Sequence, residues 1–425
     1  MIIDNKRSLA HIERVGQITP IEGADNIEQI YVLGWSLIAK KGEFKDGDLC
    51  VYVEIDSKMP EDDERFDFLA GKHYKIKTMK LGKFNVISQG IAFPISLFPE
   101  IKNPEVGMDV TDLLKVTKIL TEEEKRLASD AEYARKQLKE VKFRRAYNTH
   151  RAFFKTDFGK WAKRKRFFRW FFGLIWGRKA YDVKNFPTWI QKTDEERIEN
   201  LPQLLEYDKP LLATEKIDGT STTFAIRYLD KKRKNYDIIV CSRNVRQLDE
   251  LQPCRHDTNV YWEMFKKYDI EKALVQIADR YKCEIVILQG ETYGVSIQGN
   301  PYKLDEVCFA GYNLIIGYIE GSHGFEEATK DNCDGLYKRF GDTIQTRLNS
   351  LKARSEVIEF DIPWVPILDT DFHMINNMEK MKKLATDKSV INKKVLREGI
   401  VYRSENDPNV SFKNVSREFL IQRGE

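Results

Sequence analysis

Cysteine and histidine are scarce in this chain, and neither residue follows a metal-binding or disulfide pattern. The 425 residues include six cysteines and six histidines. The cysteines are scattered, without a C-x-x-C pair or a histidine at metal-ligand spacing, so we expect neither a zinc site nor a disulfide framework. Unpaired cysteines are typical of a reducing, intracellular compartment, and the expected location is cytoplasmic or nucleoid-associated.

Long hydrophobic runs are also absent. The N-terminus lacks the apolar segment of a signal peptide. The most apolar stretch, Phe167 to Trp176, has ten residues and includes Arg169, whereas about 20 residues are needed to span a bilayer. We therefore expect no stable membrane span.

What the chain has in excess is positive charge, and this charge is concentrated in one segment. Residues 139–184 hold fifteen Lys and Arg against three acidic residues, although the net charge of the whole chain is only +4. The remaining residues are therefore mildly acidic in sum. Thirteen aromatic residues are interleaved with the basic ones.

Three interpretations of residues 139–184 stay open. The segment could bind RNA, with basic side chains on phosphates and rings stacked on unpaired bases. It could instead form an amphipathic helix at an anionic membrane surface. The third interpretation is a helical hairpin whose Phe and Trp residues pack onto the barrel or the catalytic domain while the charges are solvated. The composition is compatible with all three.

The hydrophobic pattern predicts an α+β protein with three parts. Residues 1–118 contain short strands separated by Gly and Asp turns, which favours an OB-like β-barrel that binds nucleic acid. Residues 119–185 are predicted as a basic, aromatic helical linker or insertion, which opens with a capping box at Thr121 to Glu124. Residues 186–425 are predicted as a compact catalytic domain. The strands expected in these parts include 29–33, 35–39, 49–55, 74–81, 87–93, 210–214, 222–228, 285–289, 307–312, 399–402 and 410–413.

The most informative stretch is Glu215-Lys216-Ile217-Asp218-Gly219-Thr220, which lies between two strand-like runs. A lysine followed two residues later by an acid and then a glycine is typical of enzymes that carry a nucleotide on a lysine. Such a lysine attacks as the neutral amine, although a free lysine has a pKa near ~10.4. We therefore expect burial and cationic neighbours to lower the pKa of Lys216. The four-residue pattern Lys-x-Asp-Gly is not specific by itself, because it occurs by chance in many proteins.

Five later segments make the pattern specific. The first stretch resembles motif I of the covalent nucleotidyltransferases, the superfamily of ATP-dependent DNA and RNA ligases and mRNA capping enzymes. The later segments resemble motifs Ia, III, IIIa, IV and V of that superfamily and occur in the required order. They are Cys241 to Asn244, Gln289 to Asn300, Phe309 to Asn313, Glu398 to Arg403 and Ser411 to Asn414.

The resemblance implies an ATP-grasp-like ligase domain that uses ATP and Mg²⁺ or Mn²⁺, with Lys216 as the catalytic nucleophile. The residues that it implies for nucleotide binding are Glu215, Lys216, Ile217, Arg243 on the ribose, Glu291, Tyr312 stacked on the purine, and Lys413 on the phosphates. Asp218, Glu291 and Glu398 are implied as metal-binding residues. The chain departs from the superfamily at Ser411, where many relatives have a second lysine, and at Tyr312-Asn313, where Phe-Asp is more usual.

The N-terminal part narrows the resemblance to one branch. Segments 21–25, 34–35, 42–52 and 76–90 resemble the N-terminal OB domain of the RNA ligase five type. DNA ligases and capping enzymes place this domain after the catalytic domain, whereas here only residues 415–425 follow motif V. The resemblance therefore implies an ATP-dependent RNA ligase that joins 3′-hydroxyl and 5′-phosphate ends through a lysyl-AMP and an adenylated 5′ end, with RNA or an RNA-containing nicked duplex as its partner. The alternatives are a capping-type guanylyltransferase, a DNA ligase, or a non-catalytic RNA-binding protein.

Overall fold

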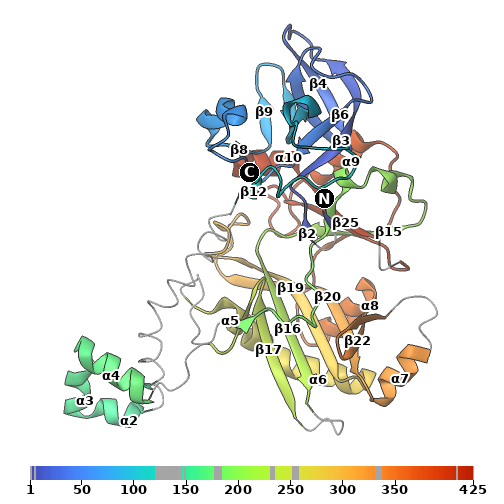
Figure 1. The fold of residues 1–425 in the computed structure, drawn as a ribbon. Helices are drawn as coiled ribbons and strands as arrows, with labels where there is room; N and C mark the ends of the chain where they lie inside the picture. Colours follow the sequence, from blue (N-terminus) through green and yellow to red (C-terminus); the bar gives the residue numbers. More distant parts are fainter. Residues whose placement is uncertain are drawn as a thin grey trace. The chain divides into compact units, whose positions relative to one another are not determined.

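The computed structural model describes residues 2–3, 6–119, 143, 146–147, 150–176, 184–229, 235–250, 258–330, 337–407 and 410–424 (Figure 1). The capping box expected at Thr121 to Glu124 lies outside these residues. The chain divides into two compact units. Unit 1 comprises Met1–Leu120, Asp194–Lys216 and Pro366–Glu425, and unit 2 comprises Thr121–Thr193 and Ile217–Val365. The boundaries expected at residues 118 and 185 follow the sequence motifs and stay predictions.

Unit 1 begins with the predicted OB-fold barrel. Its main sheet has the strand order β11-β6-β3-β4-β5 and is antiparallel throughout. The strands are β3 (Ala10–Pro20), β4 (Ile27–Val32), β5 (Trp35–Lys40), β6 (Leu49–Val53) and β11 (Ile91–Pro94). A register shift between Val15 and Ile18 interrupts the pairing of β3 with β4. β3 pairs with β6 from Ala10 to Arg14 and with β4 from Val15 to Pro20, so this long strand belongs to both halves of the sheet.

Two expected strands are each divided in the structure. The run 74–81 forms β8 (Lys75–Ile76) and β9 (Met79–Leu81), and the run 87–93 forms β10 (Val86–Ser88) and β11. β9 and β10 pair as a hairpin, while β8 joins a small sheet with β7 (Ser57–Lys58) and β12 (Thr117–Lys118).

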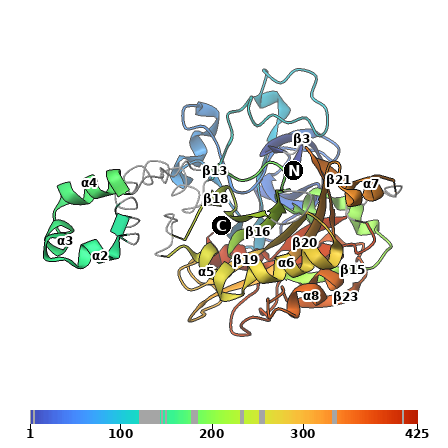
Figure 2. The ribbon, with the colours of Figure 1, turned by 90° about the horizontal axis from the view of Figure 1, so that it is seen from below.

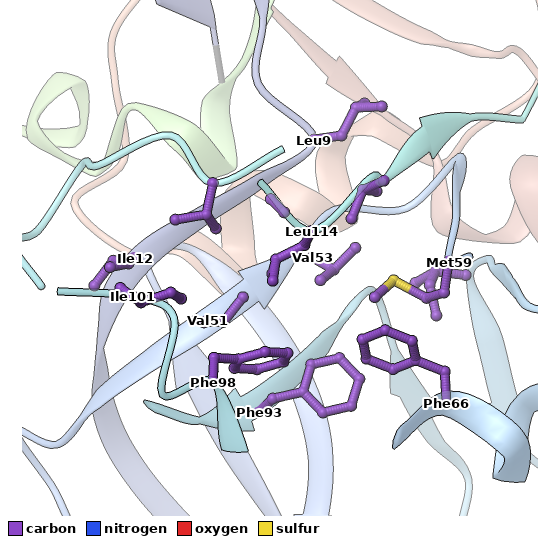
Figure 3. Close-up of a cluster of buried hydrophobic side chains, with 14 of the residues drawn as sticks. Leu9, Ile12, Val51, Val53, Met59, Phe66, Phe93, Phe98, Ile101 and Leu114 are labelled. Carbon is purple, nitrogen blue, oxygen red and sulfur yellow. The ribbon is translucent and has the colours of Figure 1, made fainter. Parts of the chain in front are cut away.

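The barrel has an apolar core on each side of its central strands. One cluster includes the rings of Phe66, Phe93 and Phe98, which meet edge-on or tilted beneath Val51 and Val53 (Figure 3). Alternate residues of β6, Cys50 and Tyr52, belong to the second cluster, as period-two alternation requires. This second cluster also contains residues from the far end of the chain, Val415 and Leu420.

The rest of unit 1 is a second, five-stranded sheet with the order β14-β25-β24-β15-β23. Its strands are β14 (Glu196–Arg197), β15 (Leu211–Lys216), β23 (Ile367–Phe372), β24 (Gly399–Arg403) and β25 (Ser411–Val415). Its core includes the buried side chains of Leu211, Tyr402 and Phe412 together with Met381 of helix α9 (Met378–Ala385). The chain ends in helix α10 (Arg417–Arg423).

The barrel makes buried polar contacts with the helical turn Ile198–Asn200, which follows β14 of the second sheet. The indole Nε1 of Trp35 donates to Asn200 Oδ1 at 2.6 Å, and Asn200 Nδ2 donates to Glu54 Oε1 at 2.9 Å. The backbone N–H of Gly34 donates to Glu199 O at 2.8 Å, and a Cβ on Gly34 would lie 2.8 Å from Glu199 Cα. Glycine is therefore needed where the barrel meets residues 199–200.

Unit 2 is built on an eight-stranded antiparallel sheet with the order β13-β18-β17-β16-β19-β20-β22-β21. Helices α5, α6 and α8 pack against this sheet (Figure 2). The strands are β13 (Lys184–Asn185), β16 (Thr220–Tyr228), β17 (Tyr236–Ser242), β18 (Val245–Gln247), β19 (Ile285–Gly294), β20 (Val307–Ile319), β21 (Lys338–Phe340) and β22 (Thr343–Arg347). The helices are α5 (Val260–Lys267), α6 (Ile270–Tyr281), α7 (His323–Lys330) and α8 (Ser350–Ile358).

Three short helices in the basic segment form a small module with a core of its own. They are α2 (Arg151–Lys155), α3 (Asp157–Ala162) and α4 (Arg166–Trp176). The buried core of the module contains Phe154, Ala162 and Phe172, which confirms the helical character predicted for these residues. None of the described helices has the length and apolar character needed to cross a bilayer.

Candidate active site

The predicted nucleophile lies at the end of a strand, beside a carboxylate. Lys216 is the last residue of β15 and pairs with Gly399, the first residue of β24. This register brings Lys216 Nζ to 2.5 Å from Glu398 Oε1, and the two side chains are only 25% and 15% exposed. Gly399 is required because a Cβ there would lie 2.2 Å from Asn414 O. The strand pairing of motifs I and IV therefore positions the amine.

Glu398 is fixed through its backbone, and one oxygen of its carboxylate makes no hydrogen bond to a described residue. The backbone carbonyl of Glu398 accepts a hydrogen bond from Ser416 N at 2.8 Å. Its Oε2 atom is buried and has no hydrogen-bond partner among the described residues. A buried carboxylate oxygen with an open lone pair suits a hard divalent cation. Across the described ranges, no three His, Cys, Asp or Glu side chains are gathered closely enough to hold a metal ion by themselves. The metal-binding roles of Asp218, Glu291 and Glu398 stay predictions.

Glu215, the residue before the lysine, uses its carboxylate within the fold. Oε1 accepts from Ser389 Oγ at 2.5 Å and Oε2 accepts from Val390 N at 2.7 Å. Burial raises the pKa of Glu215, and these two hydrogen bonds and the charge of Arg397 oppose that shift. Ile217 is buried. The nucleotide contacts predicted for Glu215 and Ile217 stay predictions, and the carboxylate of Glu215 anchors residues 389–390 to β15.

The basic residues of motifs IV and V have acidic partners that the sequence motifs do not include. Lys413 Nζ lies 3.2 Å from Asp194 Oδ1, and Arg403 Nη2 lies 2.8 Å from Glu195 Oε1. Ser411, the position at which many relatives have lysine, pairs directly across the strands with Arg403. The only sequence signal for these partners is the acidic run that begins at Asp194.

In unit 2, the turn after the lysine is held by the motif III loop. Asp218 N donates to the Tyr302 hydroxyl at 2.7 Å, and Gln298 Nε2 donates to the carbonyl of Gly219 at 3.1 Å. A Cβ on Gly219 would lie 2.4 Å from Thr292 O and 2.9 Å from Glu291 Cγ. The glycine of motif I is thus needed so that the turn fits against β19.

The motif III loop has an unusual backbone. Ser296, Gln298 and Asn300 have φ values of 64°, 48° and 52°, in the left-handed region that non-glycine residues seldom adopt. Asn300 secures the loop, because its side chain donates to Leu304 O at 2.7 Å and accepts from Leu304 N at 3.0 Å. Such strain is concentrated at functional sites, where the surrounding structure enforces it.

Tyr312 occupies a β-bulge. On β19, Gln289 and Gly290 are consecutive, but their partners on β20 are Asn313 and Gly311, so Tyr312 is the additional residue. A bulge of this kind redirects a side chain and is common beside active sites. The Tyr312 hydroxyl lies 2.8 Å from Thr193 Oγ1. The sequence contains no sign of either the bulge or this hydrogen bond.

Arg243 follows β17 and is exposed. Next to it, Lys192 Nζ donates to Asn244 Oδ1 at 2.8 Å. Burial and the charge of Arg243 lower the pKa of Lys192, so the two cations repel each other.

Glu291 is in β19, where it pairs with Ser221 and Ala310. Unit 2 therefore places motifs Ia, III and IIIa on strands β17, β19 and β20 of one sheet, with β16 between the first two. The contacts of Arg243, Glu291 and Tyr312 with a nucleotide stay predictions.

Comparison with known proteins gives consistent results for both parts of the chain. Residues 209–415 match the family model of RNA ligase, and residues 9–95 match that of an OB-fold domain. No curated protein has a matching sequence. Among solved structures, a Naegleria gruberi RNA ligase variant with ATP and Mn is similar, with 26% identity, a TM-score of 0.69 and coverage of 99% of this chain and 100% of that chain.

Two further structures of the Naegleria gruberi RNA ligase are similar over nearly their full length. A variant with AMP and Mn has 28% identity and a TM-score of 0.68, with coverage of 98% of this chain and 99% of that chain. The enzyme with PPi has 28% identity and a TM-score of 0.67, again with coverage of 98% and 99%. The similarity therefore includes the N-terminal OB fold as well as the ligase domain.

Proposed function

Because the chain belongs to the RNA ligase family and has an N-terminal OB-fold domain, we propose that it joins RNA ends in an ATP-dependent reaction that begins on Lys216. The observation that carries this proposal is the placement of Lys216 Nζ against Glu398 at the junction of motifs I and IV. The same lysine is the only one in the stretch from Glu215 to Thr220. No other side chain of motif I can form a phosphoramidate with a nucleotide.

The reaction has three displacements at phosphorus. In the first, Lys216 Nζ attacks the α-phosphorus of ATP, a P–N bond forms, and pyrophosphate leaves. In the second, an oxygen of the RNA 5′-phosphate attacks the same phosphorus and releases the lysine, which leaves AMP on the 5′ end. In the third, the RNA 3′-hydroxyl attacks the 5′-phosphorus and displaces AMP. Catalysis of such steps depends mainly on positioning and on stabilisation of charge.

Glu398 has a direct role in the first step. In the nucleotide-free site it stabilises the Lys216 ammonium, which is not nucleophilic. Its Oε1 atom is within hydrogen-bond reach of the amine, so it can accept the proton that the ammonium must lose. A divalent ion, Mg²⁺ or Mn²⁺, held by Asp218, Glu291 and Glu398 would supply positive charge that favours the neutral amine and neutralises the phosphates.

The remaining residues are proposed to bind ATP. Tyr312 stacks on the purine, Arg243 contacts the ribose, and Lys413 contacts a phosphate after it leaves Asp194. Support for Tyr312 comes from the bulge, which directs its ring away from the regular pleat. Support for Lys413 comes from its pairing with an acidic side chain, since the same point charge can bind a phosphate oxygen.

The substrate is proposed to be RNA or an RNA-containing nicked duplex, gripped by the OB-fold barrel. Repair of broken RNA is the process that this chemistry serves most directly. The four cysteines that the structure describes, Cys50, Cys241, Cys283 and Cys308, form no disulfide, which supports an intracellular location, cytoplasmic or nucleoid-associated. The family match favours an RNA ligase over a capping enzyme, a DNA ligase or a non-catalytic RNA-binding protein.

The test uses the full chain and three measurements. Incubation with labelled ATP, and separately with labelled GTP, followed by denaturing electrophoresis shows which nucleotide becomes covalently attached. A 5′-phosphorylated RNA is then offered with a second RNA that ends in a 3′-hydroxyl, and the same pair of ends is offered in DNA. Labelling by ATP together with joined RNA supports the proposal. Labelling by GTP alone would indicate a guanylyltransferase, and joining of DNA ends in preference to RNA ends would indicate a DNA ligase.

A further inference from the structure

The helical module formed by α2, α3 and α4 has an apolar surface that its own core does not use. On α4, the buried Phe172 and the partly buried Phe168 and Trp176 contribute to the core. Five other large apolar residues of the same helix are exposed, with exposed fractions between 38% and 63%. They recur at steps of three and four residues and therefore occupy one side of the helix. This α4 outer face consists of Phe167, Trp170, Phe171, Leu174 and Ile175.

A dense group of cations lies directly before the α4 outer face. The basic turn, Lys163-Arg164-Lys165-Arg166, connects α3 to α4 and includes the first residue of α4, and its last three side chains are exposed. Asp157 is the only acidic residue between positions 150 and 176, and it lies 3.2 Å from Lys160. The charge of the turn is therefore not neutralised by acidic residues of its own segment.

The state of the aromatic rings argues against stacking on RNA bases. Trp176 already stacks on two rings of the module, with centroid distances of 4.4 Å to His150 and 4.8 Å to Phe172. Phe167 and Phe171 stack on each other at 6.3 Å. Base stacking needs ring faces that are open to a nucleotide. Aliphatic side chains such as Leu174 do not provide such faces, although they do bury well in a lipid phase.

From these observations we propose that the α4 outer face and the adjacent basic turn bind the surface of an anionic lipid bilayer. Large apolar side chains on one side of a short helix, next to Lys and Arg, are the features of a helix that lies in the interface. At eleven residues, α4 is too short to span, so it lies along the surface with its outer side chains about 5–10 Å into the headgroup and acyl boundary. The basic turn contacts the anionic headgroups.

The consequence is a ligase that is held at a membrane surface by a segment separate from its catalytic motifs. None of the six nucleotidyltransferase-like segments falls within residues 150–176. Lipid binding and covalent AMP attachment are therefore independent properties. If the vesicle experiment contradicts lipid binding, the proposed ligase reaction is unaffected, and the reverse also holds.

The experiment is co-sedimentation of the full chain with vesicles. One set of vesicles is phosphatidylcholine alone and the other contains one part phosphatidylserine to two parts phosphatidylcholine. The apolar variant is Phe167→Gln/Trp170→Gln/Leu174→Gln, and the charge variant is Arg164→Gln/Lys165→Gln/Arg166→Gln. The wild type is expected to bind the anionic vesicles, and each variant is expected to bind them at least about tenfold more weakly.

Two control variants match these changes elsewhere on the surface. Phe68→Gln alters a ring of the barrel that is 63% exposed, the same fraction as Phe167. Lys40→Gln/Lys41→Gln/Lys45→Gln removes three exposed cations from the barrel. Both controls are expected to keep the vesicle affinity of the wild type. Circular dichroism establishes that every variant keeps the wild-type helix content, since all the altered side chains are exposed.

Three results would overturn the proposal. The first is a wild-type chain that does not bind anionic vesicles. The second is an apolar variant with unchanged vesicle affinity, because the basic turn would then attract any polyanion without insertion of α4. The third comes from the same variants tested with a single-stranded RNA oligonucleotide. If the apolar variant loses RNA affinity while it keeps vesicle affinity, the outer face is an RNA-binding surface instead.

Discussion

Lys216 Nζ and Glu398 Oε1 lie 2.5 Å apart, although the two residues are 182 positions apart in the sequence. The antiparallel pairing of β15 with β24 creates this contact, since Lys216 and Gly399 are the last pair of the register. A lysine and a carboxylate held in this way form an ion pair in the absence of a nucleotide. The proposed chemistry requires that this pair gives up a proton when ATP binds.

Replacement of the charge but not of the shape tests the role of Glu398. Glu398→Gln keeps an oxygen that can accept from Lys216, but it removes the negative charge that can take the proton. We expect covalent AMP attachment to slow by about 100-fold or more, in the range of positioned acid–base groups. The free energy of unfolding should change by only about 1 kcal/mol, because the pair is partly exposed. Single-turnover labelling and urea unfolding measure the two effects. An unchanged labelling rate would exclude this role.

The motif I turn depends on the hydroxyl of Tyr302. Tyr302→Phe removes the acceptor of Asp218 N, whose loss should cost about 1–3 kcal/mol if the N–H stays buried. Tyr52→Phe is the matched control, since Tyr52 is equally buried and its hydroxyl donates to Gln89 O in the barrel. Both variants should lose stability, but only Tyr302→Phe should also slow AMP attachment. Equal labelling rates in the two variants would show that the turn does not depend on Tyr302.

Stacking by Tyr312 can be separated from its hydrogen bond to Thr193. Tyr312→Phe keeps the ring and should weaken ATP binding only slightly. Tyr312→Ala removes the ring and should weaken binding by about 10-fold to 100-fold, which corresponds to the ~1–3 kcal/mol of a stacked base. Thr193→Val should resemble Tyr312→Phe, because it removes the same hydrogen bond from the other side. Equal losses for the Phe and Ala variants would assign the function to the hydroxyl.

Acid stability depends in part on Glu379. Burial alone would raise its pKa, but the hydrogen bond from Arg417 and the charges of Lys382 and Arg417 lower the pKa to about 2. A lowered pKa means that the folded state binds the proton less readily than the unfolded state does. The stabilisation is therefore fully present above the pKa of the unfolded state, ~4.3, and is lost as the pH falls toward about 2.

Urea unfolding at about pH 6 and about pH 3 measures this loss. Glu379→Gln should be less stable than the wild type at the higher pH, and its free energy of unfolding should fall less on acidification. Glu326→Gln, which alters an exposed residue of α7, is the control, and its free energy of unfolding should fall between the two pH values as much as that of the wild type. If the free energy of unfolding of Glu379→Gln also falls as much as that of the wild type, other carboxylates determine the acid response.

The barrel is expected to be necessary for the fold of the sheet that carries the nucleophile. Val415 and Leu420 belong to a core cluster whose other members are barrel residues, and Asn200 is bonded to Trp35. A chain that begins at Phe186 should therefore unfold or aggregate, and its AMP labelling should be lost with its structure. A milder change, Trp35→Phe, should cost about 1–3 kcal/mol of stability through the unpaired Asn200 oxygen. A stable, active fragment would contradict this dependence.

Much of the fold and of the site could be predicted because the signals are local. The strands that contain motifs I, III and IV are short apolar runs beside turn residues, and the structure confirms them as β15, β19 and β24. The RNA ligase family and the OB fold, both predicted from the motifs, are confirmed by the comparisons. Gly219 and Gly399 are required by close backbone contacts, which is the physical reason that the motifs contain glycine.

What could not be predicted depends on contacts between distant residues. No local pattern indicates that Tyr312 is a bulge residue, since the extra residue is defined only by the register with β19. The partners of Lys413 and Arg403 come from positions 194–195, more than 200 residues earlier. Exposure of one side of α4 also depends on which of its many apolar residues the module's small core can accommodate. Composition alone therefore left three interpretations of residues 139–184 open.

The most direct test of the account is the identification of the residue that carries AMP. The full chain is incubated with ATP and a divalent metal, digested, and analysed by mass spectrometry. We expect a mass increase of one AMP on the peptide that contains Lys216, and no adduct on Lys216→Ala, which should still join a pre-adenylated RNA to a 3′-hydroxyl end. An AMP adduct on another residue, or on the Lys216→Ala chain, would show that Lys216 is not the nucleophile.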